Sequence, residues 1–129
     1  MKVHHIGYLV KEIVRSIKAF EALGYHLRGD VQFDDGRLAD ICFMENSGYC
    51  VELIAPHRES DLYPLLKQYQ NAPYHMCYCC ENLESTIELL KADRYMLFKS
   101  PATAPAIGKS ARVAFLMHAR VGMIELVED

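Results

Sequence analysis

The sequence predicts an α+β fold made of two tandem βαβββ modules that build an open mixed sheet. The first observation is an internal repeat, because the segment that starts at His5 recurs from His75, and repeats identify folds built from copies of one unit. The identical pairs at this spacing of 70 residues are His5/His75, Tyr8/Tyr78, Ile17/Ile87, Ala22/Ala92, Tyr25/Tyr95 and Leu27/Leu97. The likeness then continues from residues 39–43 to 111–115 and from 51–53 to 124–126. Finally, β-forming runs and one helical stripe follow in the same order in both copies.

Length and composition favour a single domain over residues 1–129. A hydrophobic content of 51% supplies a core, whereas half of the chain, about 60 residues, is marginal by itself. The two copies are therefore expected to share one interior. The first module covers residues 1–56, a linker helix 57–72, and the second module 73–129, each bound being approximate.

Charge and cysteine usage exclude several classes of protein. A net charge of −3 offers no basic surface, so nucleic acid is not expected as a partner. The chain has no apolar run of about 18 residues and no pattern of a signal peptide, which predicts a cytoplasmic protein without a membrane partner. Five cysteines make a poor disulfide framework in such a chain, so reduced thiols are expected, and Cys77, Cys79 and Cys80 lack the second CxxC of a zinc site.

The first module is read from its periodicity. Residues 3–10 form an apolar strand, and Ile13, Ile17 and Phe20 give the stripe of a helix that ends near Gly24. A second strand begins at residues 25–28, and a turn is expected at 34–36. Two apolar runs, 38–44 and 48–55, then flank the turn residues 46–48 and predict a hairpin.

The linker and the second module follow the same logic. After Pro56, the sequence predicts a short helix capped near Ser60 and Asp61. Asn82 is expected to cap the next helix. The remaining expected elements are strands at 74–80 and 95–99, the helix at 83–92, a loop at 101–108, and strands at 112–118 and 122–127.

Four residues on these strands are candidate metal ligands: His5, Glu52, His75 and Glu125. Strand alternation places each beside apolar or small residues, and a buried glutamate is costly without a partner. A divalent cation shared by all four supplies that partner. Two imidazoles and two carboxylates suit nickel, cobalt, zinc or manganese and leave coordination positions open, which favours catalysis over a purely structural site.

The alternative is that these four residues have only a structural role. A strand histidine is often a hydrogen-bonded core residue, and ion pairs of the two glutamates with Arg37, Arg112 or Arg120 would also compensate them. The recurrence of both residue types in both copies favours the metal. The other histidines without a repeat partner, His26, His57 and His118, are expected on the surface or in loops.

Sequence motifs add a resemblance to a known family. The HHIG opening, the VELIAP and YHM strands and the final MIELVE strand resemble the vicinal oxygen chelate superfamily, the glyoxalase and bleomycin-resistance group. The resemblance implies paired βαβββ modules that curl into a cup around one metal. It also implies that His5, Glu52, His75 and Glu125 are the ligands.

Within that superfamily the sequence is most similar to the methylmalonyl-CoA epimerase branch, through the segments VELIAPHRESDLYPLL and GKSARVAFLMH. Lactoylglutathione lyase shares the ligand pattern, but Leu9 stands where the lyase has an arginine, and residues 118–122 stand where it has DPDG. The epimerase branch usually carries a glutamate followed by Gln-Gly, where this chain has residues 34–36. Asp34 either replaces that acid or is a turn residue.

These features predict a metal-dependent epimerase or isomerase that abstracts a proton next to the carbonyl of a small acyl thioester. Glu125 is the first choice of base, with Glu52 or Asp34 as the second acid or base. The alternatives are a lactoylglutathione lyase and a metal-free module that binds small molecules such as drugs.

The expected partner is a small-molecule substrate, with a coenzyme A thioester as the leading candidate. Lys109 and Arg112 either meet coenzyme A phosphates or are solvated. Both half-sites occur in one chain, so a monomer can complete the site, and association of modules in a homodimer is the other arrangement.

Overall fold

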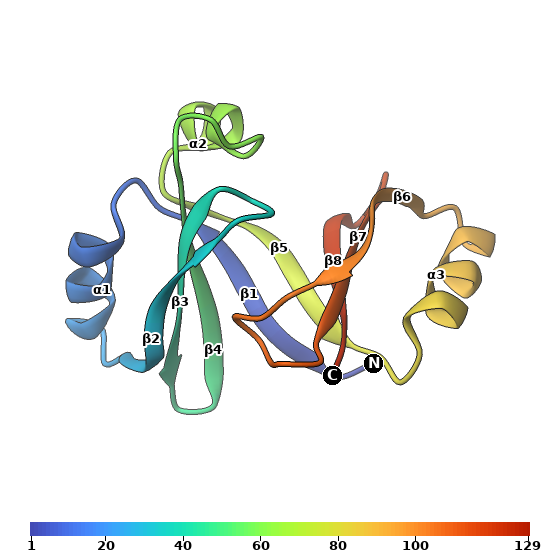
Figure 1. Ribbon diagram of the computed structural model, residues 1–129, viewed down its shortest axis with the longest axis horizontal. Helices are drawn as coiled ribbons and strands as arrows, with labels where there is room; N and C mark the ends of the chain where they lie inside the picture. The colour runs from blue at the N-terminus through green and yellow to red at the C-terminus, as the bar shows by residue number, and fades with distance from the viewer. The chain divides into compact units, whose positions relative to one another are not determined.

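A computed structural model describes all 129 residues and confirms the α+β class, with eight strands and three helices (Figure 1). The elements are β1 (Val3–Leu9), α1 (Ile13–Glu21), β2 (His26–Asp34), β3 (Ala39–Asn46), β4 (Tyr49–Pro56), α2 (Tyr63–Tyr69), β5 (Ala72–Cys79), α3 (Leu83–Ala92), β6 (Met96–Thr103), β7 (Arg112–His118) and β8 (Gly122–Glu128). The predicted order β-α-β-β-β is therefore present twice, with α2 between the two copies.

The chain divides into two compact units. One contains residues 5–74, and the other contains residues 1–4 together with 75–129. The first four residues belong with the later part of the chain because the Cys79 N–H donates to the Lys2 carbonyl at 2.9 Å. The two units are described separately.

The unit of residues 5–74 holds a mixed sheet with the strand order β2-β3-β4-β1. β1 runs parallel to β4, and the other neighbours are antiparallel. The predicted hairpin joins β3 and β4 through a two-residue turn, in which Ser47 and Gly48 have φ of 52° and 85°, as a type I′ turn requires.

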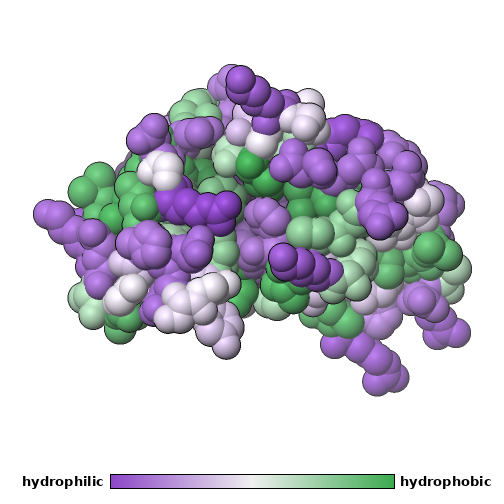
Figure 2. Space-filling model, turned by 90° about the horizontal axis from the view of Figure 1, so that it is seen from below, coloured by the Kyte–Doolittle hydropathy of each residue, from purple (hydrophilic) through white to green (hydrophobic).

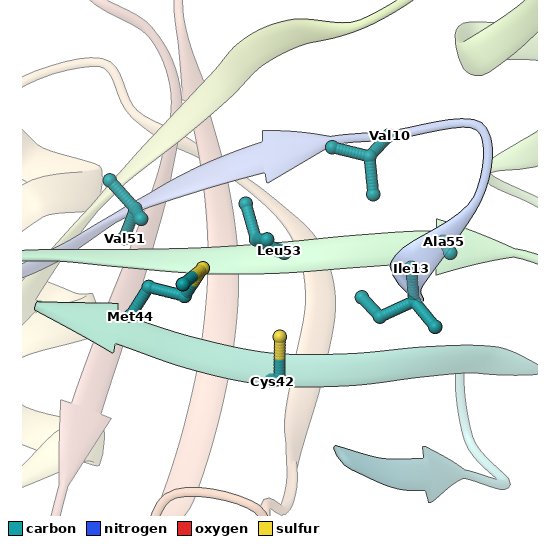
Figure 3. Close-up of a cluster of buried hydrophobic side chains, with 7 residues drawn as sticks. All are labelled: Val10, Ile13, Cys42, Met44, Val51, Leu53 and Ala55. Carbon is teal, nitrogen blue, oxygen red and sulfur yellow. The ribbon is translucent and has the colours of Figure 1, made fainter. Parts of the chain in front are cut away.

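Helix α1 packs on this sheet and encloses a hydrophobic cluster (Figure 3). Its buried members come from β3, β4, the start of the helix and the residue after β1: Val10, Ile13, Cys42, Met44, Val51, Leu53 and Ala55. The stripe predicted from the sequence is the contact face, since Ile17 and Phe20 pack against the same cluster. Burial of this apolar surface is the main force that holds the helix on the sheet.

The second unit repeats the plan with the strand order β5-β8-β7-β6, and here β5 runs parallel to β8. Helix α3 packs on the sheet over Leu83 and Ile87, which join Leu116 and Leu126 in a buried cluster. The helix begins where the sequence predicts, since the Asn82 side chain accepts a hydrogen bond from the Ser85 N–H at 2.8 Å.

Two local predictions are wrong. The expected loop at 101–108 begins later, because β6 continues through Pro101 to Thr103, at the cost of register shifts on this edge strand, where proline is tolerated. Ser60 does not cap α2 either: the helix begins at Tyr63, and no side chain caps it. The Ser60 hydroxyl instead donates to the Arg37 carbonyl.

The surface is chemically mixed. Figure 2 shows hydrophilic and hydrophobic residues interspersed over one face of the molecule. Many large apolar side chains are partly exposed, which is common on protein surfaces and indicates no partner by itself. None of the three helices has the length and apolar character needed to cross a membrane.

Candidate metal centre

The first His–Glu pair lies on β1 and β4. These strands are parallel neighbours with Gly7 opposite Glu52, so that His5 and Glu52 lie on adjacent strands. Both side chains are buried, and His5 Nε2 lies 3.4 Å from Glu52 Oε1. The His5 and Phe43 rings form a T-shaped contact with a centroid distance of 5.3 Å, a favourable geometry for aromatic rings.

The second pair has the same construction on β5 and β8. Cys77 lies opposite Glu125 in the parallel register, and His75 Nε2 lies 2.9 Å from Glu125 Oε2. Both side chains are buried, and the His75 ring meets Phe115 edge-on, again at 5.3 Å. The repeat had matched Phe43 with Phe115, so the sequence contained a signal for these supporting rings that the reasoning on ligands did not use.

The residues of each pair fit a divalent ion. Two ligand atoms that sit side by side on one first-row ion, each about 2.1 Å from it, lie about 3 Å apart. The pair distances of 3.4 and 2.9 Å are close to that value. Each pair offers an imidazole nitrogen and a carboxylate oxygen, which are donors that such ions accept. The same distances also suit a hydrogen bond from a protonated imidazole nitrogen.

Arg37 brings a positive charge to the first pair. Its Nη1 and Nη2 groups donate to the two oxygens of Glu52, at 3.3 and 3.2 Å, in a fork geometry that suits a carboxylate. Its Nε donates to Asp34 Oδ2 at 2.9 Å. The ion pair with Arg37 that the sequence left as an alternative compensation for Glu52 is therefore confirmed.

Asp34 lies at the end of β2 and forms the predicted turn. Its Oδ1 accepts hydrogen bonds from the backbone N–H groups of Gly36, at 2.8 Å, and of Arg37, at 3.1 Å. The structure thus brings Asp34 to the first pair through Arg37. A carboxylate with three hydrogen bonds of this kind is well placed to hold the arginine side chain.

The remaining candidate side chains lie elsewhere. Arg112 pairs with Glu84 and Glu128, whose carboxylates raise its pKa, and Lys109 is exposed. His57 is half-exposed and lies 3.2 Å from Asp40.

None of the five cysteines forms a disulfide, in line with the reduced thiols expected from the sequence. Burial, followed in size by the charge of Glu52, raises the pKa of the Cys42 thiol to about 12. This thiol therefore stays protonated at neutral pH and behaves as a core side chain.

Comparisons with known proteins identify the family and the fold. The family model described as Glyoxalase/Bleomycin resistance protein/Dioxygenase superfamily matches residues 4–115. A hypothetical protein from Bacillus halodurans C-125 has a similar structure, with a TM-score of 0.86 at 24% identity, over 99% of this chain and 94% of that one. No curated protein matches the sequence at a significant level.

Two methylmalonyl-CoA epimerases are also among the similar structures. The enzyme from Mycobacterium tuberculosis gives a TM-score of 0.82 at 20% identity, over 98% of this chain and 86% of that one. A variant of the Streptomyces coelicolor enzyme, in complex with 2-nitronate-propionyl-CoA, gives 0.84 at 14% identity, over 100% and 94%. At these identities the neighbours show the fold alone. Because the family model covers most of the sequence, the chain belongs to the glyoxalase/bleomycin resistance protein/dioxygenase superfamily.

Proposed function

We propose that this protein is a metal-dependent enzyme that removes a proton next to a carbonyl group, and that its substrate is a small acyl thioester of the methylmalonyl-CoA type. The observation that carries the proposal is the presence of two buried His–Glu pairs at repeat-related strand positions in a member of this superfamily. Structural neighbours that act on or bind acyl-CoA compounds support the choice of substrate.

His5, Glu52, His75 and Glu125 are proposed to hold one divalent ion, which is nickel, cobalt, zinc or manganese. The repeat relates the two pairs residue by residue, which supports a common role for them. Such an ion supplies Lewis acidity at the substrate carbonyl oxygen, which lowers the cost of removing the neighbouring proton.

Glu125 is the proposed base. Its carboxylate is buried, and His75 Nε2 lies 2.9 Å from its Oε2. Both oxygens of Glu52 accept hydrogen bonds from a permanently charged guanidinium, so proton uptake at Glu52 requires the loss of an ion pair. Asp34 is bound by the same guanidinium and by two backbone N–H groups. These contacts support Glu125 as the group that receives the proton.

One observation favours a second candidate, a small-molecule binding protein of the same fold that needs no metal. The Arg37 guanidinium already compensates the buried charge of Glu52, so the first pair is stable without an ion. In this alternative the pairs are structural, and removal of metal changes neither folding nor binding.

The test is hydrogen exchange at the substrate carbon. Methylmalonyl-CoA is incubated with the protein in deuterated water, and deuterium incorporation is followed by mass spectrometry in three samples: protein as purified, protein treated with chelator, and treated protein resupplied with nickel or cobalt. The proposal expects exchange that is lost with chelator and restored by the ion. A parallel assay measures S-lactoylglutathione formation from methylglyoxal and glutathione, which should be weaker or absent.

The outcomes separate the alternatives. Strong lyase turnover without thioester exchange would transfer the assignment to a lactoylglutathione lyase. Exchange that is unaffected by chelator would refute metal dependence. A metal-loaded sample without either activity would refute the proposed substrate.

A further inference from the structure

We infer that Arg37 and the divalent ion compete for Glu52, so that the guanidinium is the cation that holds this carboxylate when no ion is bound. The inference rests on the proposed function in one respect, that Glu52 is a metal ligand. It adds a residue that regulates occupancy of the site. It also gives Asp34 a role, as the anchor that keeps Arg37 beside the first pair.

The contacts of Glu52 carry the first step. Arg37 donates to both Glu52 oxygens, and His5 Nε2 lies 3.4 Å from Oε1, the oxygen that also receives Arg37 Nη1. The oxygen nearest the imidazole is therefore one that the arginine uses. A metal ion ligated by His5 and Glu52 requires lone pairs of the same carboxylate. The ion would therefore lie close to the positive charge of the Arg37 guanidinium.

Charge decides the direction of the effect. A guanidinium and a divalent ion on one carboxylate repel each other, and the repulsion is stronger in a buried site than in water. The Arg37 side chain is only 12% exposed and Glu52 is 0% exposed, so solvent screens this interaction weakly. Arg37 also withdraws negative charge from the carboxylate. Both effects weaken metal binding and stabilise the metal-free protein.

Several hydrogen bonds hold Arg37 in place. Asp34 accepts hydrogen bonds from the Arg37 N–H and from Nε, and the buried Ser60 hydroxyl donates to the Arg37 carbonyl. The next residue, Leu38, has φ of 49°, a conformation that L-residues other than Asn, Asp and Gly rarely adopt. Its carbonyl accepts a hydrogen bond from the His57 N–H at 2.9 Å. These contacts hold the turn in its sparsely populated conformation and thereby keep Arg37 beside Glu52.

The experiment compares Arg37→Gln and Arg37→Lys with the wild type and with Arg28→Gln. The last variant is the matched control, because Arg28 forms an ion pair with Glu45 on the same sheet, but its side chain is 63% exposed. Two quantities are measured for each protein: the dissociation constant of Co²⁺, by calorimetry and by the visible absorption of the bound ion, and the midpoint of thermal unfolding with chelator present.

Arg37→Gln should bind Co²⁺ about 10-fold more tightly than the wild type, because it removes a positive charge that repels the ion. The same variant should unfold at a lower temperature in chelator, because Glu52 loses its buried counter-charge. Arg37→Lys keeps a positive charge but not the fork of donors, so both quantities should fall between those of Arg37→Gln and the wild type. Arg28→Gln should change neither.

Unchanged or weaker Co²⁺ binding in Arg37→Gln would overturn the inference, since it would mean that Arg37 supports Glu52 as a ligand. If that variant does not fold, Arg37→Lys decides: tighter binding than the wild type supports competition, and equal or weaker binding overturns it. If the wild type binds no Co²⁺, the proposed metal-dependent function fails. Binding that appears only in Arg37→Gln would still support competition, and no binding in any variant would overturn both.

Discussion

The two His–Glu pairs have the same strand positions, but the loops that precede β3 and β7 differ in the two units. In the first unit, Arg37 lies in the turn after β2 and donates hydrogen bonds to both oxygens of Glu52. The matching loop of the second unit, residues 104–111, contains no arginine, and its Lys109 is exposed. The arginine at the start of β7, Arg112, pairs with Glu84 and Glu128. The two copies thus share the imidazole, the carboxylate and the phenylalanine ring, but only the first copy has an arginine in this loop.

On the proposed function, the two carboxylates have different roles. The first pair is electrostatically compensated by Arg37 within its own unit, which suits a carboxylate that acts as a ligand. In the second pair, His75 Nε2 lies 2.9 Å from Glu125 Oε2. We therefore assign proton transfer to Glu125 and a supporting role to Glu52.

The largest expected effect tests this division directly. At saturating metal, Glu125→Gln should lower α-proton exchange by about 10²–10⁴-fold, because an amide occupies the same space but cannot accept the proton. Glu52→Gln should have a smaller effect on the rate and a larger effect on the metal dissociation constant. A greater loss of rate in Glu52→Gln at full occupancy would reverse the assignment.

A second comparison concerns the two cores. Leu53 and Leu126 occupy repeat-related positions and are both fully buried, so Leu53→Ala and Leu126→Ala should each reduce the free energy of unfolding by about 2–5 kcal/mol. Urea denaturation provides the measurement. Leu89→Ala is the control, because that side chain is 71% exposed and should change stability by less than about 0.5 kcal/mol. A cost below about 1 kcal/mol at either buried site would contradict the core assigned to that unit.

The smallest effects come from the repeat-related helix caps. The Glu12 carboxylate accepts hydrogen bonds from Val14 and Arg15 N–H, and these bonds, that of Arg15 first, lower its pKa. Because the pKa of Glu12 is lower in the folded state, its contribution is present above the unfolded pKa of 4.5 and is lost as the pH falls through the folded value. Asn82 caps α3 with a group that does not titrate.

Glu12→Ala should therefore be destabilising at pH 7 and progressively less so in acid. Asn82→Ala should cost about 1 kcal/mol, with little change between pH 7 and pH 3. Thermal unfolding of both variants between pH 7 and pH 3 gives the measurement. A pH-independent cost of Glu12→Ala would exclude the capping carboxylate as its cause.

The internal repeat explains why much of the fold could be predicted from the sequence. Each copy supplies a second, independent example of the same strand and helix periodicity, and matched His and Glu residues stand out against apolar neighbours. The α3 cap at Asn82 was also predictable, because asparagine is a preferred capping residue. Glu12 was not, since glutamate rarely occupies that position and its role depends on local backbone geometry.

Other features depend on contacts between distant residues. Arg37 and Glu52 are 15 residues apart in the sequence, and their ion pair depends on how the chain folds. The sequence could therefore offer Arg37 as one of several possible partners of Glu52, but it could not identify which arginine forms the pair. Ser60 resembles a helix cap by its position in the sequence, yet its hydroxyl donates a hydrogen bond to the Arg37 carbonyl. Strand β6 continues through Pro101 because it is an edge strand, where a missing N–H costs little.

The central claim is that the two pairs hold one divalent ion. The most direct test is the amount of nickel or cobalt bound per chain at equilibrium, measured by dialysis and elemental analysis for the wild type, His5→Ala, His75→Ala and the double variant. We predict one ion per chain in the wild type, loss of most of it in His75→Ala and none in the double variant. Two ions per chain, or stoichiometric metal in the double variant, would contradict the account.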